Sequence, residues 1–143
     1  MQMNLDCFKD VLQYCVQNID YEEFGHSWRV KPVNLDMLYE ALNSKYKRKY
    51  IMRSTLQLYE CGFIRFSTRF PENKPYLERC TIEDVSFKGY QFMESIKEPS
   101  IWEKTKSVVS KVGNHTLEFV EGVAHDIAIE SAKQAVTIMM TEQ

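Results

Sequence analysis

The residues best suited to intermolecular chemistry are cations gathered in one short stretch. Between Ser44 and Ser54, the sequence SKYKRKYIMRS contains five lysines and arginines and no carboxylate. Such a cluster can bind phosphate groups, because ammonium and guanidinium groups neutralise them and donate hydrogen bonds to them. It can equally form the solvated face of a helix, which is the commoner role of a charge run. The five cations are Lys45, Lys47, Arg48, Lys49 and Arg53.

The charge of the chain is distributed unevenly. Residues 44–79 carry nine cations and three carboxylates, which gives a local charge of +6. Because the whole chain has a net charge of −2, the remaining residues must carry −8. We therefore expect one positive face, which would attract polyanions over a Debye length although the molecule as a whole is slightly acidic.

Residues that could support catalysis or hold a metal show none of the required spacings. His26, His115 and His125 form no H-E-x-x-H motif and have no cysteine at ligand spacing. The chain also has no nucleophile elbow and no glycine-rich phosphate loop. We therefore expect a protein that is not an enzyme and that uses neither a metal nor another cofactor.

The cysteines and the apolar segments bear on location. The four cysteines have no C-x-x-C spacing and no secretory leader precedes them, which favours a cytoplasmic protein with reduced, buried thiols. No apolar run approaches the roughly 20 residues of a membrane span, so no membrane partner is expected. The cysteines are Cys7, Cys15, Cys61 and Cys80.

Two helices are predicted in the first part of the chain. Apolar residues at intervals of three and four predict a helix at about residues 4–18. A second, shorter helix is expected after Asn34, which is a suitable N-cap residue. The polar segment between them, residues 19–32, is interpreted as a loop, with Ser27–Val30 as a candidate short strand.

A third helix is expected to carry the cations. It is predicted at about residues 46–61 and ends at Gly62, because glycine readily adopts the left-handed conformation that closes helices. Residues four apart share one side of a helix, so the cations should form a stripe opposite the apolar side. The stripe consists of Lys45, Lys49 and Arg53, and the opposite side of Ile51, Thr55 and Leu58.

A β-hairpin is predicted after the third helix. Residues 63–70, FIRFSTRF, alternate between apolar and polar side chains, as in a half-buried strand with Arg65 and Arg69 on its wet face. A loop containing Lys74 and bounded by two prolines follows, and residues 76–82 form the returning strand. These cations could contact a nucleic-acid backbone or minor groove, or could simply keep an edge hairpin soluble.

Helical signals return in the C-terminal half. Ser86 is expected to cap a helix in which Gly89 allows close approach to the hairpin. Pro99 can open the next helix, which Gly113 would end. Thr116 can cap a last helix of about 25 residues, roughly 37 Å long.

The last helix contains a row of small residues that favours close helix packing. Either this helix folds back on its own domain, or two copies of the chain pair it across a two-fold axis as a homodimer. Its acidic side chains argue against binding to an anionic membrane. The row consists of Gly122, Ala124, Ala128, Ala132 and Ala135.

The order helix, helix, helix, hairpin, helix predicts a mostly α (α+β) fold of the winged helix-turn-helix type, with a two-stranded hairpin as the wing. We expect a winged-helix domain over residues 1–97 and a C-terminal helical extension over residues 98–143. In such a domain the third helix and the hairpin would face DNA, and nine of the chain's 18 cations lie in or next to these elements.

Three groups of residues carry a resemblance to a known family: Leu58, Glu60, Cys61, Gly62, Phe63 and Ile64; Ser86, Gly89, Tyr90 and Phe92; and Trp102, Lys104 and Lys106. With the closing amphipathic helix, they resemble the phage- and prophage-associated bacterial family called domain of unknown function 2513. The resemblance covers about residues 60–143 well and the N-terminal half loosely. It implies a short winged-helix protein of mobile-element origin and no established activity. The chain differs in having Ser rather than Thr at position 86 and Tyr at position 90.

Fold order and charge together favour binding of double-stranded DNA with a role in regulating transcription, the third helix entering the major groove and the hairpin lying beside it. The alternative is a non-enzymatic interaction module that binds a host or phage protein, because a fold does not determine a function. The expected DNA-contacting residues are Lys45, Lys47, Arg48, Lys49, Arg53, Gln57, Arg65, Arg69 and Lys74.

Overall fold

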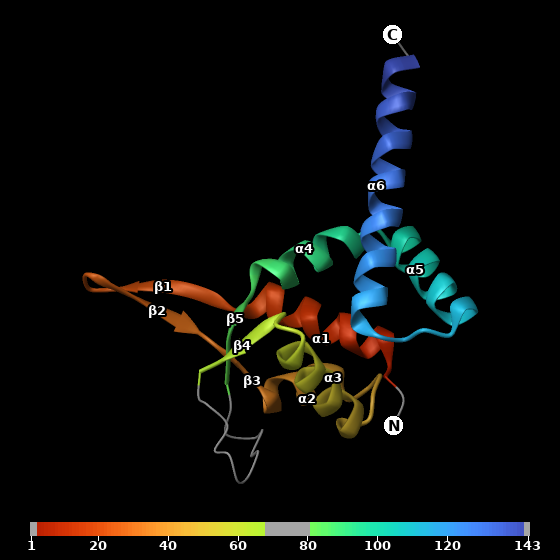
Figure 1. The fold of residues 1–143 in the computed structure, drawn as a ribbon. Coiled ribbons are helices and arrows are strands. Elements are labelled where there is room, and N and C mark those ends of the chain that lie inside the picture. Colours follow the sequence, from red (N-terminus) through yellow and green to blue (C-terminus); the bar gives the residue numbers. More distant parts are fainter. Residues whose placement is uncertain (1–2, 68–80, 142–143) are drawn as a thin grey trace. The chain divides into compact units, whose positions relative to one another are not determined.

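The computed structural model describes residues 3–67 and 81–141 of the chain. They form a mostly helical α+β protein with two small antiparallel sheets (Figure 1). The chain divides into two compact units, Met1–Tyr90 and Gln91–Gln143. The division falls inside a helix, before the boundary at residue 97 that we expected from the sequence.

Helix α1 (Leu5–Asn18) supplies one side of the core of the first unit. It begins where predicted, because the side chain of Asn4 accepts a hydrogen bond of 3.0 Å from the backbone N–H of Cys7. Its apolar side chains recur every three or four residues, and most of them are buried, as the sequence indicated. The buried residues are Cys7, Phe8, Val11, Leu12 and Cys15.

The segment after α1 is a β-hairpin: the candidate strand Ser27–Val30 is confirmed as part of β2, whereas the interpretation of the rest as a loop was wrong. Strands β1 (Asp20–Phe24) and β2 (Ser27–Lys31) pair over their full lengths and project as an arm, visible in Figure 1. Gly25, with φ of +62°, begins the two-residue turn between them. The polar composition concealed this hairpin, because both strands lie in solvent and have no apolar face to produce a period of two.

Strand β3 (Val33–Asn34) and helix α2 (Leu35–Leu42) follow the arm. Asn34 is the N-cap of α2, as predicted, since its side chain accepts a 2.9 Å hydrogen bond from the N–H of Met37. The helix buries three leucines, including Leu38, against its neighbours. Strand β3 was not predicted, because two residues are too few to show a pattern.

Helix α3 (Arg48–Glu60) packs against α1, α2 and strand β4 (Ile64–Phe66). It starts two residues later than predicted, so Lys45 lies in the preceding turn and not on the helix. Its end is confirmed, because Gly62 has the left-handed φ of +77°. The buried face contains the three expected residues, Ile51, Thr55 and Leu58, together with Ser54.

A three-stranded antiparallel sheet completes the first unit. Strand β5 (Thr81–Val85) lies between β3 and β4 and pairs with both. The predicted pairing of β4 with a returning strand is therefore confirmed, and β3 adds a third strand. The predicted alternation also holds in β4, where Ile64 is buried and Arg65 is exposed. The expected loop and residues 76–80 of the returning strand lie outside the described residues.

The start of helix α4 (Phe87–Ile96) is held against the end of α3. The N–H of Gly89 donates a 3.1 Å hydrogen bond to the Ser86 hydroxyl, which in turn donates to the carbonyl oxygen of Gly62. The N–H of Ser86 donates a 2.9 Å hydrogen bond to the carbonyl oxygen of Phe63. Ser86 therefore caps α4, as expected, and also fixes this helix to the corner where α3 becomes β4.

The second unit contains the end of α4 and two further helices. Helix α5 (Pro99–Val112) opens on proline and ends at Gly113, whose φ is +74°. Thr116 accepts a 3.4 Å hydrogen bond from the N–H of Phe119 at the start of α6 (Leu117–Thr141). All three boundaries agree with the prediction. Within the described segments, no helix is long and apolar enough to cross a lipid bilayer.

The approach of α4 to β4 predicts opposite effects for two glycine-to-alanine substitutions. In Gly89→Ala, the new Cβ would lie 2.5 Å from the Phe63 carbonyl oxygen and 2.8 Å from a methyl group of Val85. We expect a loss of roughly 1–3 kcal/mol in the free energy of unfolding. Gly122→Ala in α6 meets nothing within 4 Å and should add about 0.5–1 kcal/mol. Urea unfolding followed by circular dichroism measures both, and equal effects would contradict the proposed close contact.

Candidate nucleic-acid interface

The five cations of the Ser44–Ser54 stretch are all exposed. None of them forms an ion pair with a carboxylate in the part of the chain that the structure describes. They lie within nine residues at the start of α3, in the turn before it and on its first two turns. Their charges are therefore available to a partner.

The start of α3 lacks the cap that the first two helices have. Its N-cap residue is Lys47, which makes no side-chain capping bond, and its first turn contains no acidic residue. Within the described residues, the backbone N–H groups of Arg48 and Lys49 have no acceptor. Cations at this position oppose the helix macrodipole, whose positive end is the N-terminus. The helix start is therefore a concentrated positive pole that an anion would stabilise.

Aromatic contacts and a hydrogen bond order the side chains around this pole. The guanidinium of Arg48 lies 4.8 Å from the ring centre of Tyr39 in α2. The Tyr46 hydroxyl donates a 2.7 Å hydrogen bond to a carboxylate oxygen of Asp10 in α1. Burial and this contact raise the pKa of Tyr46, so the hydroxyl stays protonated at neutral pH. The turn before α3 is thereby tied to α1.

Two of the three predicted stripe residues share the outer face of α3. Lys49 and Arg53 are four residues apart and exposed, on the side away from the buried Ile51 and Leu58. Lys45 does not continue this row, because the helix has not yet begun at that position. The cationic surface therefore bends around the helix start and does not form a straight line.

Gln57 is less accessible than the cations. Its side-chain carbonyl oxygen is buried and, among the residues in view, has no hydrogen-bond donor. This oxygen is therefore unavailable for contact with a base edge, although the sequence made Gln57 a candidate for that role. The exposed cations of α3 are thus the predicted contact residues of this helix that a base or phosphate could reach directly.

The predicted wing residues are described only in part. Arg65 lies on β4, and its guanidinium is 3.8 Å from a carboxylate oxygen of Asp84, its cross-strand neighbour on β5. At 65% side-chain exposure it can still reach a ligand, with its charge partly balanced by this pair. Arg69 and Lys74 lie outside the described residues.

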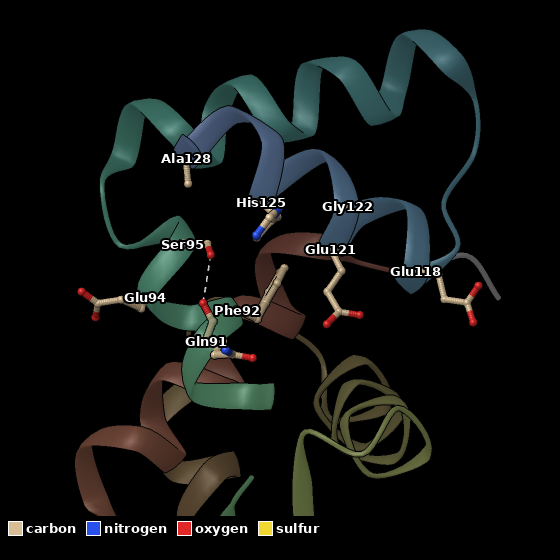
Figure 2. A pocket seen from close by; sticks show the side chains of 9 residues that line it. All are labelled: Gln91, Phe92, Glu94, Ser95, Glu118, Glu121, Gly122, His125 and Ala128. Atoms are coloured by element: carbon tan, nitrogen blue, oxygen red, sulfur yellow. Dashed lines mark hydrogen bonds between the residues drawn. The ribbon is translucent and has the colours of Figure 1, made fainter. Parts of the chain in front are cut away.

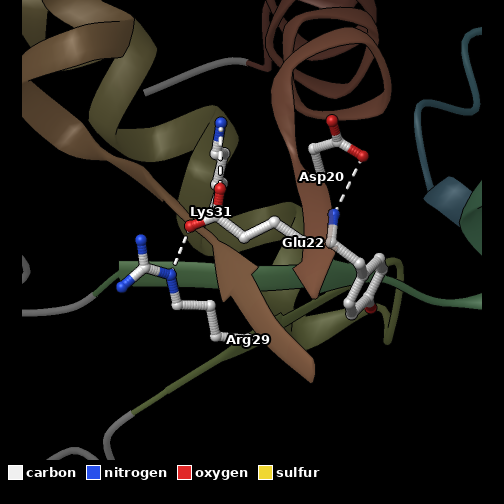
Figure 3. Close-up of polar contacts among 5 residues, drawn as sticks. Asp20, Glu22, Arg29 and Lys31 are labelled. Atoms are coloured by element: carbon white, nitrogen blue, oxygen red, sulfur yellow. Dashed lines mark hydrogen bonds and ion pairs between the residues drawn. The ribbon is translucent and has the colours of Figure 1, made fainter. Parts of the chain in front are cut away.

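The arm carries a surface that the sequence analysis missed. Glu22 of β1 accepts a hydrogen bond from the guanidinium of Arg29 and forms an ion pair with Lys31, both on β2 (Figure 3). The hydrogen bond from Arg29 is the main reason that the pKa of Glu22 is lowered. This network holds the two strands together. With Asp20 and Glu23 included, the arm has three carboxylates and two cations, so it is a poor site for phosphate groups.

Three aromatic side chains of the arm are exposed. Tyr21 is 47% exposed, Phe24 64% and Trp28 67%. Large aromatic residues in solvent on a thin hairpin mark a surface for contact with another molecule. The signal in the sequence was the set of aromatic residues flanking Gly25, but the acidic residues beside them concealed the strand pattern.

The cysteines and histidines show no arrangement for metal binding in residues 3–67 and 81–141. No group of three or more His, Cys, Asp or Glu side chains there could hold a metal ion. Cys7 and Cys15 are buried, and burial raises the pKa of both thiols, that of Cys15 to about 12. Both thiols therefore stay protonated and unreactive at neutral pH.

The structure defines the class as a mostly helical α+β protein with small antiparallel sheets and a positive pole at the start of α3. A sequence model of the family described as "Hypothetical protein (DUF2513)" matches residues 2–115, so the chain belongs to this family. The match confirms the family and extends over the N-terminal half, but it ends before α6, which the resemblance inferred from the motifs had included. No curated protein and no solved structure matches the chain.

The uncapped helix start predicts that Lys47→Asp stabilises the protein. The backbone of Lys47 already has the extended conformation of an N-cap residue, with φ of −67° and ψ of 150°. An aspartate there should add about 1 kcal/mol to the free energy of unfolding by capping a free N–H and by matching the macrodipole. The control Lys45→Asp makes the same charge change in the turn and should stay within about 0.5 kcal/mol of wild type. Equal stabilisation by both variants in thermal unfolding would contradict the capping argument.

Proposed function

We propose that this protein binds double-stranded DNA as a winged-helix protein, with α3 in the major groove. The observation that carries the proposal is the set of five exposed, unpaired cations around the uncapped start of α3. A helix that places cations at its positive end gives up stability. A polyanionic partner that neutralises them explains why such an arrangement is useful.

The topology supports this proposal. The order α1, β3, α2, α3, β4, β5 and the strand order β3-β5-β4 are those expected of a winged helix, in which the segment between β4 and β5 forms the wing. Helix α3 contacts α1, α2 and β4 along its inner side, which leaves its outer side for a groove. The arm is then an insertion between α1 and β3.

The proposed biological role is regulation of phage or prophage transcription. Its support is the family resemblance, which suggests a mobile-element origin. Binding would rest mainly on phosphate contacts, because lysine and arginine side chains reach the backbone most readily, and Arg53 would make one of these contacts from the outer face of α3.

The proposal predicts a steep dependence of DNA affinity on salt. Five phosphate contacts give a slope of about −4.5 for the logarithm of the binding constant against the logarithm of salt concentration. Arg53→Ala should reduce that slope by about 1. The control Arg29→Ala removes an exposed arginine of the arm that is paired with Glu22, and it should leave the slope unchanged. Fluorescence anisotropy on a random duplex at several salt concentrations measures all three slopes. A wild-type slope near zero would overturn the proposal.

The arm favours a second candidate function, that of a protein-interaction module. Isolated two-stranded hairpins are marginally stable in water, and this one exposes Phe24 and Trp28 on an arm with three carboxylates and two cations. Aromatic residues of this kind commonly anchor protein interfaces. The partner would be a host or phage protein, bound by the arm and not by α3.

One experiment distinguishes DNA binding by α3 from protein binding by the arm. The wild type, Trp28→Ala and Arg53→Ala are each used to capture partners from a bacterial lysate with and without nuclease. If the arm binds a protein, a partner should resist nuclease and be lost only with Trp28→Ala. If DNA is the ligand, nuclease should release everything that the wild type retains. A nuclease-resistant partner that both variants retain would contradict both assignments.

A further inference from the structure

The C-terminal half of α6 carries an apolar stripe that nothing covers within the described residues. From Gln134 to Thr141 the helix has no charged residue, and all of its side chains are exposed. Successive residues of an α-helix are about 100° apart around its axis. Most of the large apolar side chains in the C-terminal half of α6 therefore fall on one side, within an arc of roughly 100°. We call these residues the α6 stripe: Ile129, Ala132, Val136, Met139 and Met140.

The α6 stripe lies on a different side from the face that packs on α5. Val120 and Ala124 are the buried residues of α6, and α5 is the helix that α6 contacts. Ile138 lies on the same side of α6 as Val120 and Ala124, whereas Val136 lies on nearly the opposite side. The predicted row of small residues is thus divided, since Ala124 is buried while Ala132 and Ala135 are exposed. In Figure 1 the C-terminal half of α6 extends beyond α5.

The α6 stripe continues into a groove at the other end of the helix. The groove has a volume of about 690 Å³ and lies between the end of α4 and the first half of α6 (Figure 2). Gly122 and His125 line it and share the side of α6 that bears the stripe. Glu118 and Glu121 make its α6 wall acidic, whereas Glu94 on the α4 wall is paired with Lys97 at 2.6 Å. One face of α6 is therefore hollow and acidic in its first half, and apolar and uncharged in its second half.

We propose that this face binds a second copy of the chain, with the two α6 helices antiparallel. A parallel pair would place the groove carboxylates of the two copies together, and like charges repel. An antiparallel pair instead lays the uncharged stripe of each copy over the groove of the other. It also brings Lys133, which borders the stripe, towards the acidic half of the other helix, so the charges are complementary.

Sequence spacing indicates where the two-fold axis lies. Val136 and Gly122 are each seven residues from Ile129. With the axis at Ile129, Val136 faces Gly122 of the second copy, and an added Cβ at Gly122 would have nothing within 4 Å, so space is available. Both helices then overlap along nearly their full length of about 37 Å.

The size of the contact predicts a weak dimer. Two helices about 10 Å wide and about 37 Å long bury less than the roughly 800 Å² per partner of a standard interface. We therefore expect reversible dimerisation with a Kd in the micromolar range. Dimerisation through α6 does not involve DNA. The dimer proposal can therefore be refuted while the DNA-binding proposal stands, and the DNA-binding proposal can be refuted while the dimer proposal stands.

Sedimentation equilibrium of the full chain without nucleic acid tests the proposal. The mass should rise from 16.9 kDa towards twice that value as concentration increases through the micromolar range. Val136→Glu should raise the Kd at least about tenfold, because it buries two unpaired carboxylates. Ile138→Glu is the matched control, since Ile138 and Val136 are 58% and 54% exposed on opposite sides, and it should leave the Kd unchanged. A mass of 16.9 kDa at every concentration, or equal weakening by both variants, would overturn the proposal.

Cysteine crosslinking tests the orientation. Ile129→Cys lies at the proposed axis and should form a disulfide-linked dimer under mild oxidation. Val136→Cys should not, because its two copies would be separated by about 21 Å along the helices. The wild type provides the background from its own cysteines. Crosslinking of Val136→Cys as efficient as that of Ile129→Cys would show a parallel pair and overturn the antiparallel arrangement.

Discussion

The approach of α4 to the backbone at Phe63 is the contact on which the arrangement of the first unit depends. Gly62 turns the chain out of α3 with a positive φ, and Ser86 then bonds both the carbonyl oxygen of Gly62 and that of Phe63. Gly89 lets α4 lie directly on this corner, since an added Cβ would be 2.5 Å from the Phe63 oxygen. The corner fixes the end of α3, the start of β4 and the end of β5 together. The cations at the far end of α3 are therefore presented by a helix whose other end is held by backbone hydrogen bonds.

Several residues that carry the family resemblance serve this architecture. Gly62, Ser86 and Gly89 build the corner at Phe63. The ring of Phe92 packs edge-on against Trp102 at a centroid distance of 6.4 Å in the second unit. The cations of the Ser44–Ser54 stretch are not among the residues that carry the resemblance. The proposed binding activity is therefore argued from exposed side chains and not from the family motifs.

Patterns in the sequence predicted the elements that bury an apolar face. The helices and the β4–β5 pairing were predicted because their apolar residues recur at the spacing of a helix or a strand. Capping residues such as Asn34 and Thr116 marked where helices begin. The arm was missed because neither of its faces is buried. The start of α3 was placed too early because the lysines before it are good helix formers, although no cap begins the helix there. Composition located the cationic cluster, but only the fold shows that Lys45 lies off the helix and that the oxygen of Gln57 points inward.

The way the arm leaves the first unit has a consequence for how the protein can diverge. Asp20 and Lys31 pair with each other across the ladder, so the chain departs from the helical core and returns to it at neighbouring points. Ile19 and Val33, which flank this pair in the sequence, are both buried and anchor the points where the chain leaves the core and returns to it. Lengthening, shortening or replacing the hairpin would leave those anchors in place. The arm is thus a separable appendage, free to acquire a new binding preference while the helices behind it keep the same packing.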